Sequence, residues 1–485
     1  MYVCSGLFCA VATLSAQHDA LWMRAFGGSD MDDAEDVLQT NDGGYLVAGY
    51  TNSFPLGSKY AWVIKLDANG DTLWTRIYRD FNTPSAKAAC ETDDGAYAIV
   101  GSSSYTDLAW IFKIDANGDT LWTRNYRGKI ASHFADIQQT EDGGYILAGV
   151  AGDYGPHHDL RSASLIKTDV NGDTLWTRRY GEDTWSFAWS VSQTNDGGYV
   201  LAGAQVYTDP IVRALLVRTD SIGTLLWQHI YGGDLQGYLL DVWQIPDGGF
   251  IAAGVSSGAG GVDGLLIRTD ANGDTLWTKT YGGSDWDELR AILRVSDTGY
   301  VLLGSTLSYG HRDGDAWILA VDAAGDTIWT QTVGGVGYDR SDSGMQTTDG
   351  GFIVCGKTRS YGGGSDDLWV FKTDSLGNTI SLNAANERSR SMPQIFALHP
   401  AYPNPFNPAT TIRYELPAAV PVQLMVYDLL GREVIRLVEA TQSPGTYEVP
   451  WDGTDALGRS LTSGIYIARL VTPEYSQAIK LVLLK

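Results

Sequence analysis

Short runs of apolar residues, separated by clusters of turn residues, make up most of the chain. Between residues 34 and 78 four such runs occur: Ala34–Thr40, Tyr45–Thr51, Ala61–Asp67 and Thr72–Tyr78. Asn-Gly between two such runs is a strong hairpin signal, because both central residues need a positive φ. No stretch shows sustained 3.6-residue periodicity with capping residues. We therefore expect strands throughout and almost no helix.

The same pattern of four runs recurs along residues 20–382. The run Asn-Gly-Asp-Thr-Leu-Trp, or a near relative, marks each period, and the marker tryptophans lie 48–54 residues apart. These are Trp22, Trp74, Trp122, Trp176, Trp227, Trp277 and Trp329. A second marker, Asp-Gly-Gly-Tyr or a variant of it, occurs seven times. Both markers indicate seven periods.

Four strands in each period of about 50 residues are typical of a β-propeller blade. One four-stranded sheet cannot bury both of its faces, but sheets packed radially against each other can. We predict an all-β fold, with a seven-bladed propeller over residues 17–382. A linear β-solenoid is the alternative, for which the period is long.

The order of strands predicts how the propeller closes. The marker tryptophan lies on the last strand of each period, yet the first one, Trp22, precedes every complete period. The seventh period has Ser381 where its tryptophan should be. We therefore expect residues 20–26 to supply the outer strand of blade seven, which would leave no open edge between the termini.

Alternating strand directions place the loops on two faces. The Asp-Gly-Gly and Asp-x-Asn-Gly-Asp turns share one face and are short and uniform. The loops between the second and third strands share the other face with the connectors between blades, and these loops vary. Because repeat proteins usually carry function on the variable face, we expect binding there. The candidate residues are Tyr105, Tyr154, Tyr207, Trp286, Tyr309, His311, Arg312 and Tyr361.

Charge and composition exclude some classes of binding partner. The net charge is −23 and no apolar run is long enough to span a membrane, so we expect neither a nucleic-acid partner nor a membrane span. Residues 1–16 resemble a secretory signal peptide that lacks its basic start, so the true start could lie upstream of Met1. Beyond it only Cys90 and Cys355 remain, and we expect both as buried thiols.

The repeated turn suggests some chemistry but favours a structural role. Asp67-Ala68-Asn69-Gly70-Asp71 resembles the start of an EF-hand calcium loop, but Thr72 and Tyr78 stand where that loop needs Gly and a bidentate carboxylate. We expect no cofactor and leave calcium at irregular loops open. The stretch also resembles the Asp-box of sialidase-like propellers and the tryptophan-docking motif of quinoprotein propellers. Both motifs hold blades together, which implies packing rather than catalysis.

After a polar linker at residues 383–399, the composition changes. Six short strands are expected within residues 400–485, which predicts a small Ig-like β-sandwich. Five motifs carry a resemblance here: YPNPFNP at 402–408, VYDLLGREV at 426–434, WDGTDALG at 451–458, SGIYIARL at 463–470 and KLVLLK at 480–485. They resemble the type A C-terminal sorting domain of type IX secretion. That resemblance implies export across the outer membrane and contact of residues 400–485 with the secretion machinery.

Together these observations predict a secreted or cell-surface binding module with an unidentified glycan or protein ligand on the variable-loop face. We predict no catalytic residues. Two alternatives stay open: a hydrolase or lyase acting on polysaccharide, and a structural surface-layer protein. Asp is plentiful, and a sequence does not show whether two carboxylates lie at catalytic spacing.

Overall fold

The structure is a computed structural model of the 485-residue chain. It describes residues 21–484 with gaps at 55–58, 79–83, 104–107, 128–129, 153–160, 182–183, 207–210, 233–235, 259–260, 297–298, 380–395, 400, 402–403, 408, 417–419, 443–444, 457–458 and 474. All regular elements of these residues are strands. None of them forms a helix that could cross a membrane. The predicted signal peptide, residues 1–16, lies outside the described residues and stays a prediction.

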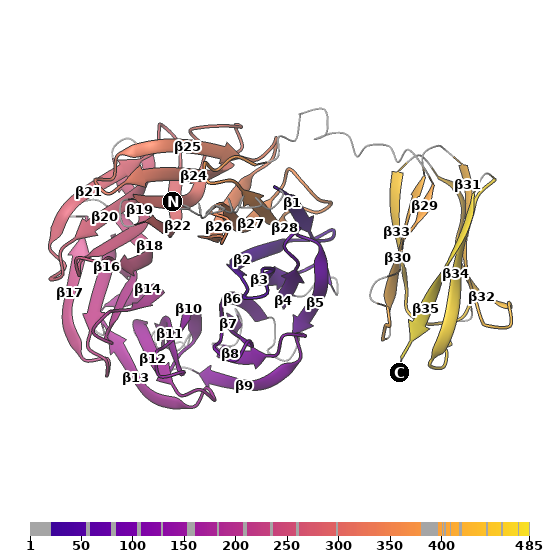
Figure 1. Ribbon diagram of the computed structural model, residues 1–485, viewed down its shortest axis with the longest axis horizontal. Helices are drawn as coiled ribbons and strands as arrows, with labels where there is room; N and C mark the ends of the chain where they lie inside the picture. The colour runs from indigo at the N-terminus through magenta and orange to yellow at the C-terminus, as the bar shows by residue number, and fades with distance from the viewer. Residues whose placement is uncertain are drawn as a thin grey trace, which may run out of the picture. The chain divides into compact units, whose positions relative to one another are not determined.

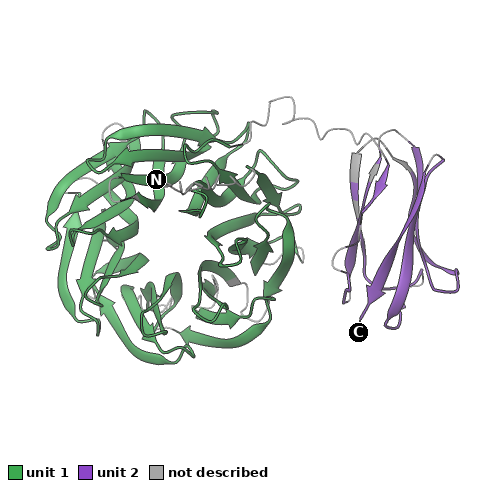
Figure 2. Ribbon diagram, in the orientation of Figure 1, with its two compact units in different colours: residues 1–380 green, residues 381–485 purple. Residues whose placement is uncertain are grey.

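The chain divides into two compact units, residues 1–380 and 381–485 (Figure 2). The first holds seven four-stranded antiparallel sheets arranged as blades around a centre, from indigo to orange in Figure 1. This confirms the all-β class and the seven blades.

The blades follow each other along the chain. Blade 1 contains β2 (Asp32–Gln39), β3 (Tyr45–Thr51), β4 (Tyr60–Leu66) and β5 (Thr72–Tyr78). Blade 2 contains β6 (Pro84–Glu91), β7 (Tyr97–Ser103), β8 (Leu108–Ile114) and β9 (Thr120–Arg127). Blade 3 contains β10 (His133–Gln139), β11 (Tyr145–Ala151), β12 (Ser162–Thr168) and β13 (Thr174–Tyr180). Blade 4 contains β14 (Trp185–Gln193), β15 (Tyr199–Val206), β16 (Val212–Thr219) and β17 (Leu225–Tyr231). Blade 5 contains β18 (Gln236–Gln244), β19 (Phe250–Gly258), β20 (Gly261–Thr269) and β21 (Thr275–Tyr281). Blade 6 contains β22 (Asp287–Ser296), β23 (Gly299–Thr306), β24 (Asp315–Asp322) and β25 (Thr327–Val333).

Blade 7 combines both ends of the first unit. Its inner strands are β26 (Asp339–Gln346), β27 (Phe352–Thr358) and β28 (Asp367–Thr373), and its outer strand is β1 (Met23–Phe26). β1 runs antiparallel to β28, with Met23 opposite Phe371 and Phe26 opposite Leu368. One buried cluster joins Trp22 and Val47 to Ile353 and Val370, so blade 1 also packs against blade 7. The N-terminal strand β1 is thus the fourth strand of this sheet, next to β28.

Each marker tryptophan packs on the glycine of the Asp-x-Asn-Gly-Asp turn in the next blade. Trp22 lies over Gly70 and donates a 3.1 Å hydrogen bond from Nε1 to the carbonyl of Ala68. Six more pairs repeat the contact: Trp74 with Gly118, Trp122 with Gly172, Trp176 with Gly223, Trp227 with Gly273, Trp277 with Gly325, and Trp329 with Gly377. These turns need glycine for their positive φ and for the closeness of the indole. The expected packing of tryptophan between blades is confirmed.

The second unit is a β-sandwich with its own core, which includes Tyr414, Leu424, Trp451 and Leu481. One sheet contains β29 (Ala397–Leu398), β30 (Thr410–Leu416) and β33 (Gly445–Trp451). The other contains β31 (Val420–Tyr427), β32 (Glu433–Gln442), β34 (Gly464–Val471) and β35 (Ser476–Leu483). Because β29 pairs with β30, the paired strands of this unit begin inside the stretch 383–399 that we expected to be linker.

Candidate functional site

The innermost strand of every blade carries a β-bulge at the same place, opposite a glycine of the second strand. In blade 1 the bulge is at Glu35, and the glycine is Gly49. A Cβ on Gly49 would overlap the carbonyl oxygen of Asp33, so only glycine allows the two strands this close. The bulged residues are Glu35, Lys87, Ala135, Trp189, Leu240, Arg290 and Asp342.

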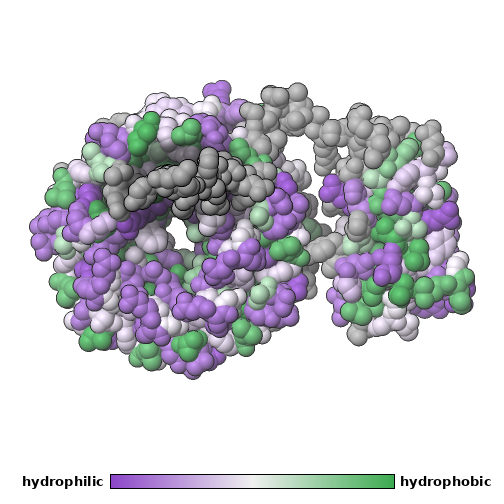
Figure 3. All heavy atoms as spheres, viewed as in Figure 1, coloured by the Kyte–Doolittle hydropathy of each residue, from purple (hydrophilic) through white to green (hydrophobic). Residues whose placement is uncertain are grey.

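Side chains at the bulge, and two positions before it, contact side chains of neighbouring innermost strands near the centre of the propeller. The molecule is hollowed at this centre in the space-filling view (Figure 3). These positions lie in the half of each strand next to the blade connectors, which is the variable-loop face. Their chemistry differs from blade to blade, whereas the turns around them repeat. We refer to this place as the axial site.

One part of the axial site is charged and extends over blades 6, 7, 1 and 2. Arg290 lies 2.6 Å from Asp342, measured from Nε to Oδ1. Arg340 in turn contacts Asp342 at 2.9 Å and Asp33 at 3.4 Å. Glu35 and Lys87 form an ion pair between blades 1 and 2. We call these six residues the charged arc.

The carboxyl groups of the charged arc are buried, and their pKa values differ because their charged neighbours differ. The side chains of Asp33 and Asp342 are 6% and 4% exposed. Burial, with the nearby Asp342 carboxylate, raises the pKa of Asp33 to about 8. Burial acts in the same direction on Glu35, but the adjacent Lys87 ammonium outweighs it and lowers the pKa of Glu35 to about 2. Asp33 Oδ1 and Ser85 Oγ are buried without a hydrogen-bond partner among the described residues.

The opposite part of the axial site is aromatic and belongs to blades 4 and 5. Phe187 and Trp189 have nearly parallel rings, 5.8 Å apart with an interplanar angle of 5°. Tyr238 meets Trp189 edge-on at 5.4 Å. Trp185, two residues before Phe187 on β14, is 39% exposed. We call Phe187, Trp189 and Tyr238 the aromatic arc. Its flat rings suit the apolar face of a sugar or a side chain.

His133 of blade 3 stands between the two arcs. Its Nδ1 lies 2.6 Å from Ser102 Oγ of blade 2. Burial, with the nearby Lys87 ammonium, lowers the pKa of His133 from 6.5 to about 4. The imidazole is therefore neutral at physiological pH and can exchange one hydrogen bond with Ser102.

Five of the eight residues predicted from the sequence are described, and they lie in loops and connectors on the variable-loop face. Tyr105, Tyr154 and Tyr207 fall outside the described residues. Trp286 is 47% exposed, and its carbonyl accepts the N–H of Leu307, which brings it beside the loop that carries Tyr309, His311 and Arg312. His311 Nδ1 lies 3.3 Å from Asp315, and Arg312 is exposed.

Two of the predicted tyrosines also hold the connectors in place. Tyr309 donates its hydroxyl hydrogen bond to the Gly282 carbonyl at 2.7 Å, and Tyr361 donates to Gly334 at 2.9 Å. The sequence-based candidates therefore include no residue of the axial site. The signal that could have found it is the glycine repeated in every second strand, which marks each bulge.

The aspartates of the repeated turns accept hydrogen bonds from backbone N–H groups of the same turns. Asp67 Oδ1 accepts the N–H groups of Asn69 and Asp71 at 2.9 and 2.8 Å, and the corresponding aspartates of the other blades do the same. Asp42 of the other turn pairs with Lys65 at 2.8 Å. Among the described residues no group of three or more His, Cys, Asp or Glu side chains could hold a metal ion.

Comparison with known proteins identifies the second unit. Residues 407–472 match the model of the FlgD Ig-like domain, in agreement with the predicted Ig-like sandwich. A search of curated protein sequences found no significant match.

Several solved structures resemble the chain at low similarity. One is PorZ of Porphyromonas gingivalis, described as an essential bacterial surface component of the type IX secretion system: 12% identity, 93% of this chain, TM-score 0.36. The chain spans 52% of the length of PorZ. Another is extracellular domains 1–2 of Drosophila semaphorin 1b: 9% identity, 72% of this chain, 86% of that one, TM-score 0.44. A third is puromycin hydrolase: 13% identity, 79% of this chain, 59% of that one, TM-score 0.48. At such TM-scores the assignment of the fold rests on the sheets themselves.

Proposed function

We propose that this protein is an exported binding protein whose axial site holds a segment of an extracellular glycan or protein. One observation carries the proposal: the axial positions differ in chemistry in every blade, while the residues that build the blades repeat. Residues needed for the fold alone would be expected to repeat with it.

The two arcs restrict the chemistry of the ligand. Phe187 and Trp189 are stacked with nearly parallel rings, and such a pair offers an aromatic face to a sugar ring or a side chain. In the charged arc Lys87, Arg290 and Arg340 are each already paired with a carboxylate. A balanced arc of this kind favours a neutral or zwitterionic ligand over a polyanion.

The test is binding by the full chain of glycans on an array and of proteins in a pull-down, compared with a Trp189→Ala variant. We expect Trp189→Ala to weaken binding at least about tenfold, because the stacking surface is lost. Ile328→Ala, at an outer-strand residue that is 62% exposed, is the matched control and should bind normally. Wild-type protein that binds no member of either panel would contradict the proposal. Release of products from polysaccharide would favour the hydrolase or lyase alternative.

We also propose that the second unit directs export, as the resemblance to type A sorting domains implies. The match to an Ig-like domain supports it, and so does a contact between two of the five motifs. Phe406 of YPNPFNP donates its N–H to Val482 and accepts the N–H of Leu484, both at 2.9 Å. The first motif is thereby joined to the terminal strand β35.

Deleting residues 396–485 should retain the protein inside the cell in a host with type IX secretion. Normal surface display of the truncated chain would contradict a sorting role.

A further inference from the structure

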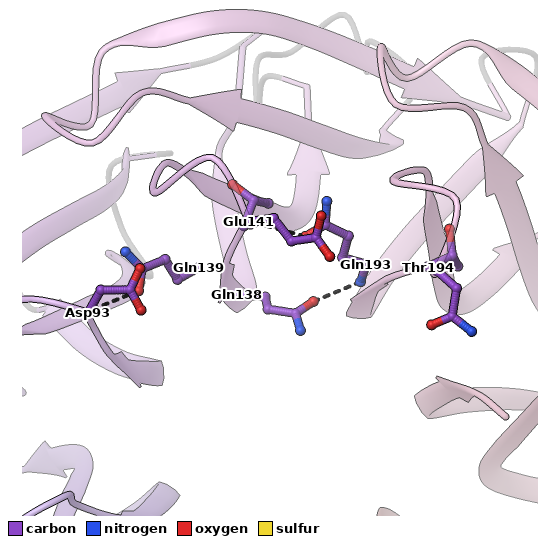
Figure 4. Close-up of a pocket in the computed structure, with 8 residues that line it drawn as sticks. Asp93, Gln138, Gln139, Glu141, Gln193 and Thr194 are labelled. Atoms are coloured by element: carbon purple, nitrogen blue, oxygen red, sulfur yellow. Dashed lines mark hydrogen bonds between the residues drawn. The ribbon is translucent and has the colours of Figure 1, made fainter. Parts of the chain in front are cut away.

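The end of the axis opposite the axial site carries a pocket of about 310 Å³ at the tips of blades 2, 3 and 4 (Figure 4). It lies on the face of the short uniform turns, where we expected no binding from the sequence. Its walls are polar and come from Asp93, Gln138, Gln139, Glu141, Gln193 and Asn195. None of the described lining residues is Lys or Arg.

The side-chain amide oxygens of Gln138 and Gln193 each accept a hydrogen bond from a backbone N–H group. Gln138 Oε1 accepts the N–H of Gln193 at 2.7 Å, and Gln193 Oε1 accepts the N–H of Glu141 at 3.3 Å. These bonds orient each amide and leave its NH₂ group as the donor on the other side. Neither Nε2 donates a hydrogen bond to a described residue. The carboxylates of Glu141 and Asp93 belong to exposed turn residues and supply acceptors at the rim.

The repeat changes its chemistry at this pocket. The place of Gln138 in its innermost strand is taken elsewhere by Leu38, Cys90, Ser192, Trp243, Leu293 and Met345. Gln138 is therefore the one amide among seven equivalent positions. Trp243, in the same position two blades further on, is 39% exposed and adds an aromatic surface to this end of the axis.

We propose that this pocket is a second binding site, for a neutral glycan. A sugar hydroxyl donates and accepts at once, so it pairs with a wall that offers both oriented amide donors and carboxylate acceptors. An anion would meet carboxylates without any cation, and the oriented NH₂ groups disfavour a bare cation. The volume is at the lower end of the range for ligand pockets, about 300 Å³, which suits one or two sugar residues.

Gln193→Glu is the decisive variant because it keeps the interblade bond. Blade 2 already carries a carboxylate in this role, since Glu91 accepts the N–H of Asn41 at 2.9 Å. A glutamate at 193 therefore still accepts from Glu141 but can no longer donate into the pocket. Gln39→Glu makes the same change at the other side of the propeller, where Gln39 accepts the N–H of Thr348, and serves as the control.

The experiment titrates the full chain with neutral hexasaccharides of glucose, xylose and mannose, and with a lysine-rich peptide, by calorimetry. We expect at least one hexasaccharide to bind, Gln193→Glu to weaken it about tenfold and Gln39→Glu to leave it unchanged. Trp189→Ala should leave this binding intact, which separates the pocket from the axial site. No hexasaccharide binding, an equal effect of the two glutamate variants, or binding of the peptide alone would overturn the proposal.

Discussion

The N–H of Thr348 in blade 7 donates a 2.9 Å hydrogen bond to Gln39 Oε1 in blade 1, across 309 residues of sequence. The same bond joins blades 1–2, 2–3, 3–4 and 4–5 through Glu91, Gln139, Gln193 and Gln244. It does not form between blades 5 and 6, where Pro246 has no N–H to donate and Arg294 replaces the glutamine. Blade 7 is thus joined to blade 1 by the bond used between consecutive blades.

The first prediction concerns Trp22, which joins blade 7 to blade 1 at the outer edge. Trp22 is 4% exposed and covers Gly70. Trp22→Ala should lower the free energy of unfolding of the propeller by about 3–5 kcal/mol, because it removes a large buried side chain near the chain terminus. Leu73→Ala, at a residue that is 58% exposed, should change it by less than about 0.5 kcal/mol. Urea denaturation measures both, and equal midpoints would contradict the role of Trp22 in closure.

Much of this architecture could be predicted because it repeats. Seven tryptophans and seven glycine turns indicated the number of blades, and Trp22, which has no period of its own, led us to expect that residues 20–26 join the ends. The axial site could not be predicted in the same way. Glu35 and Asp342 lie in distant parts of the sequence, and only the bulge in each innermost strand turns such side chains toward one centre. Tyr309 was a candidate by exposure, but its bond to Gly282 depends on a fold that brings residues 27 apart together.

The second prediction concerns the charged arc. Arg340→Met would leave Asp33 and Asp342 without this partner in a place where both are less than a tenth exposed. We expect a loss of about 3–5 kcal/mol in the free energy of unfolding. Lys279→Met removes an ion pair whose side chains are 39% and 70% exposed, and it should cost about 1 kcal/mol or less. Similar losses in chemical denaturation would show that burial does not set the value of the Arg340 contacts.

The third prediction concerns the glycine opposite each bulge. A Cβ on Gly149 would overlap the carbonyl oxygen of His133, so Gly149→Ala must push the two strands apart. We expect a loss of about 3 kcal/mol in the free energy of unfolding. Gly143 has a φ of +78° and open space around it, so Gly143→Ala should cost only the left-handed conformation, about 1–2 kcal/mol. A Gly149→Ala variant more stable than Gly143→Ala in denaturant titrations would argue against the tight bulge.

The last prediction concerns the pH dependence that His133 introduces. Burial and Lys87 hold its folded-state pKa at about 4, and Lys59, Arg161 and Glu35 also act on it. In the unfolded chain the imidazole takes up a proton near pH 6.5. Because the folded pKa is depressed, the contribution of His133 to stability is complete above pH 6.5 and is lost as the pH falls toward 4, by about 3 kcal/mol in total. In His133→Asn the side chain can still bond to Ser102 but does not titrate, so the difference in unfolding free energy between wild type and variant should shrink across this window. Acidic groups with shifted pKa values act equally in both proteins and cancel from the difference. Two unfolding curves that stay parallel from pH 7 to pH 4 would show that His133 is not the group that titrates.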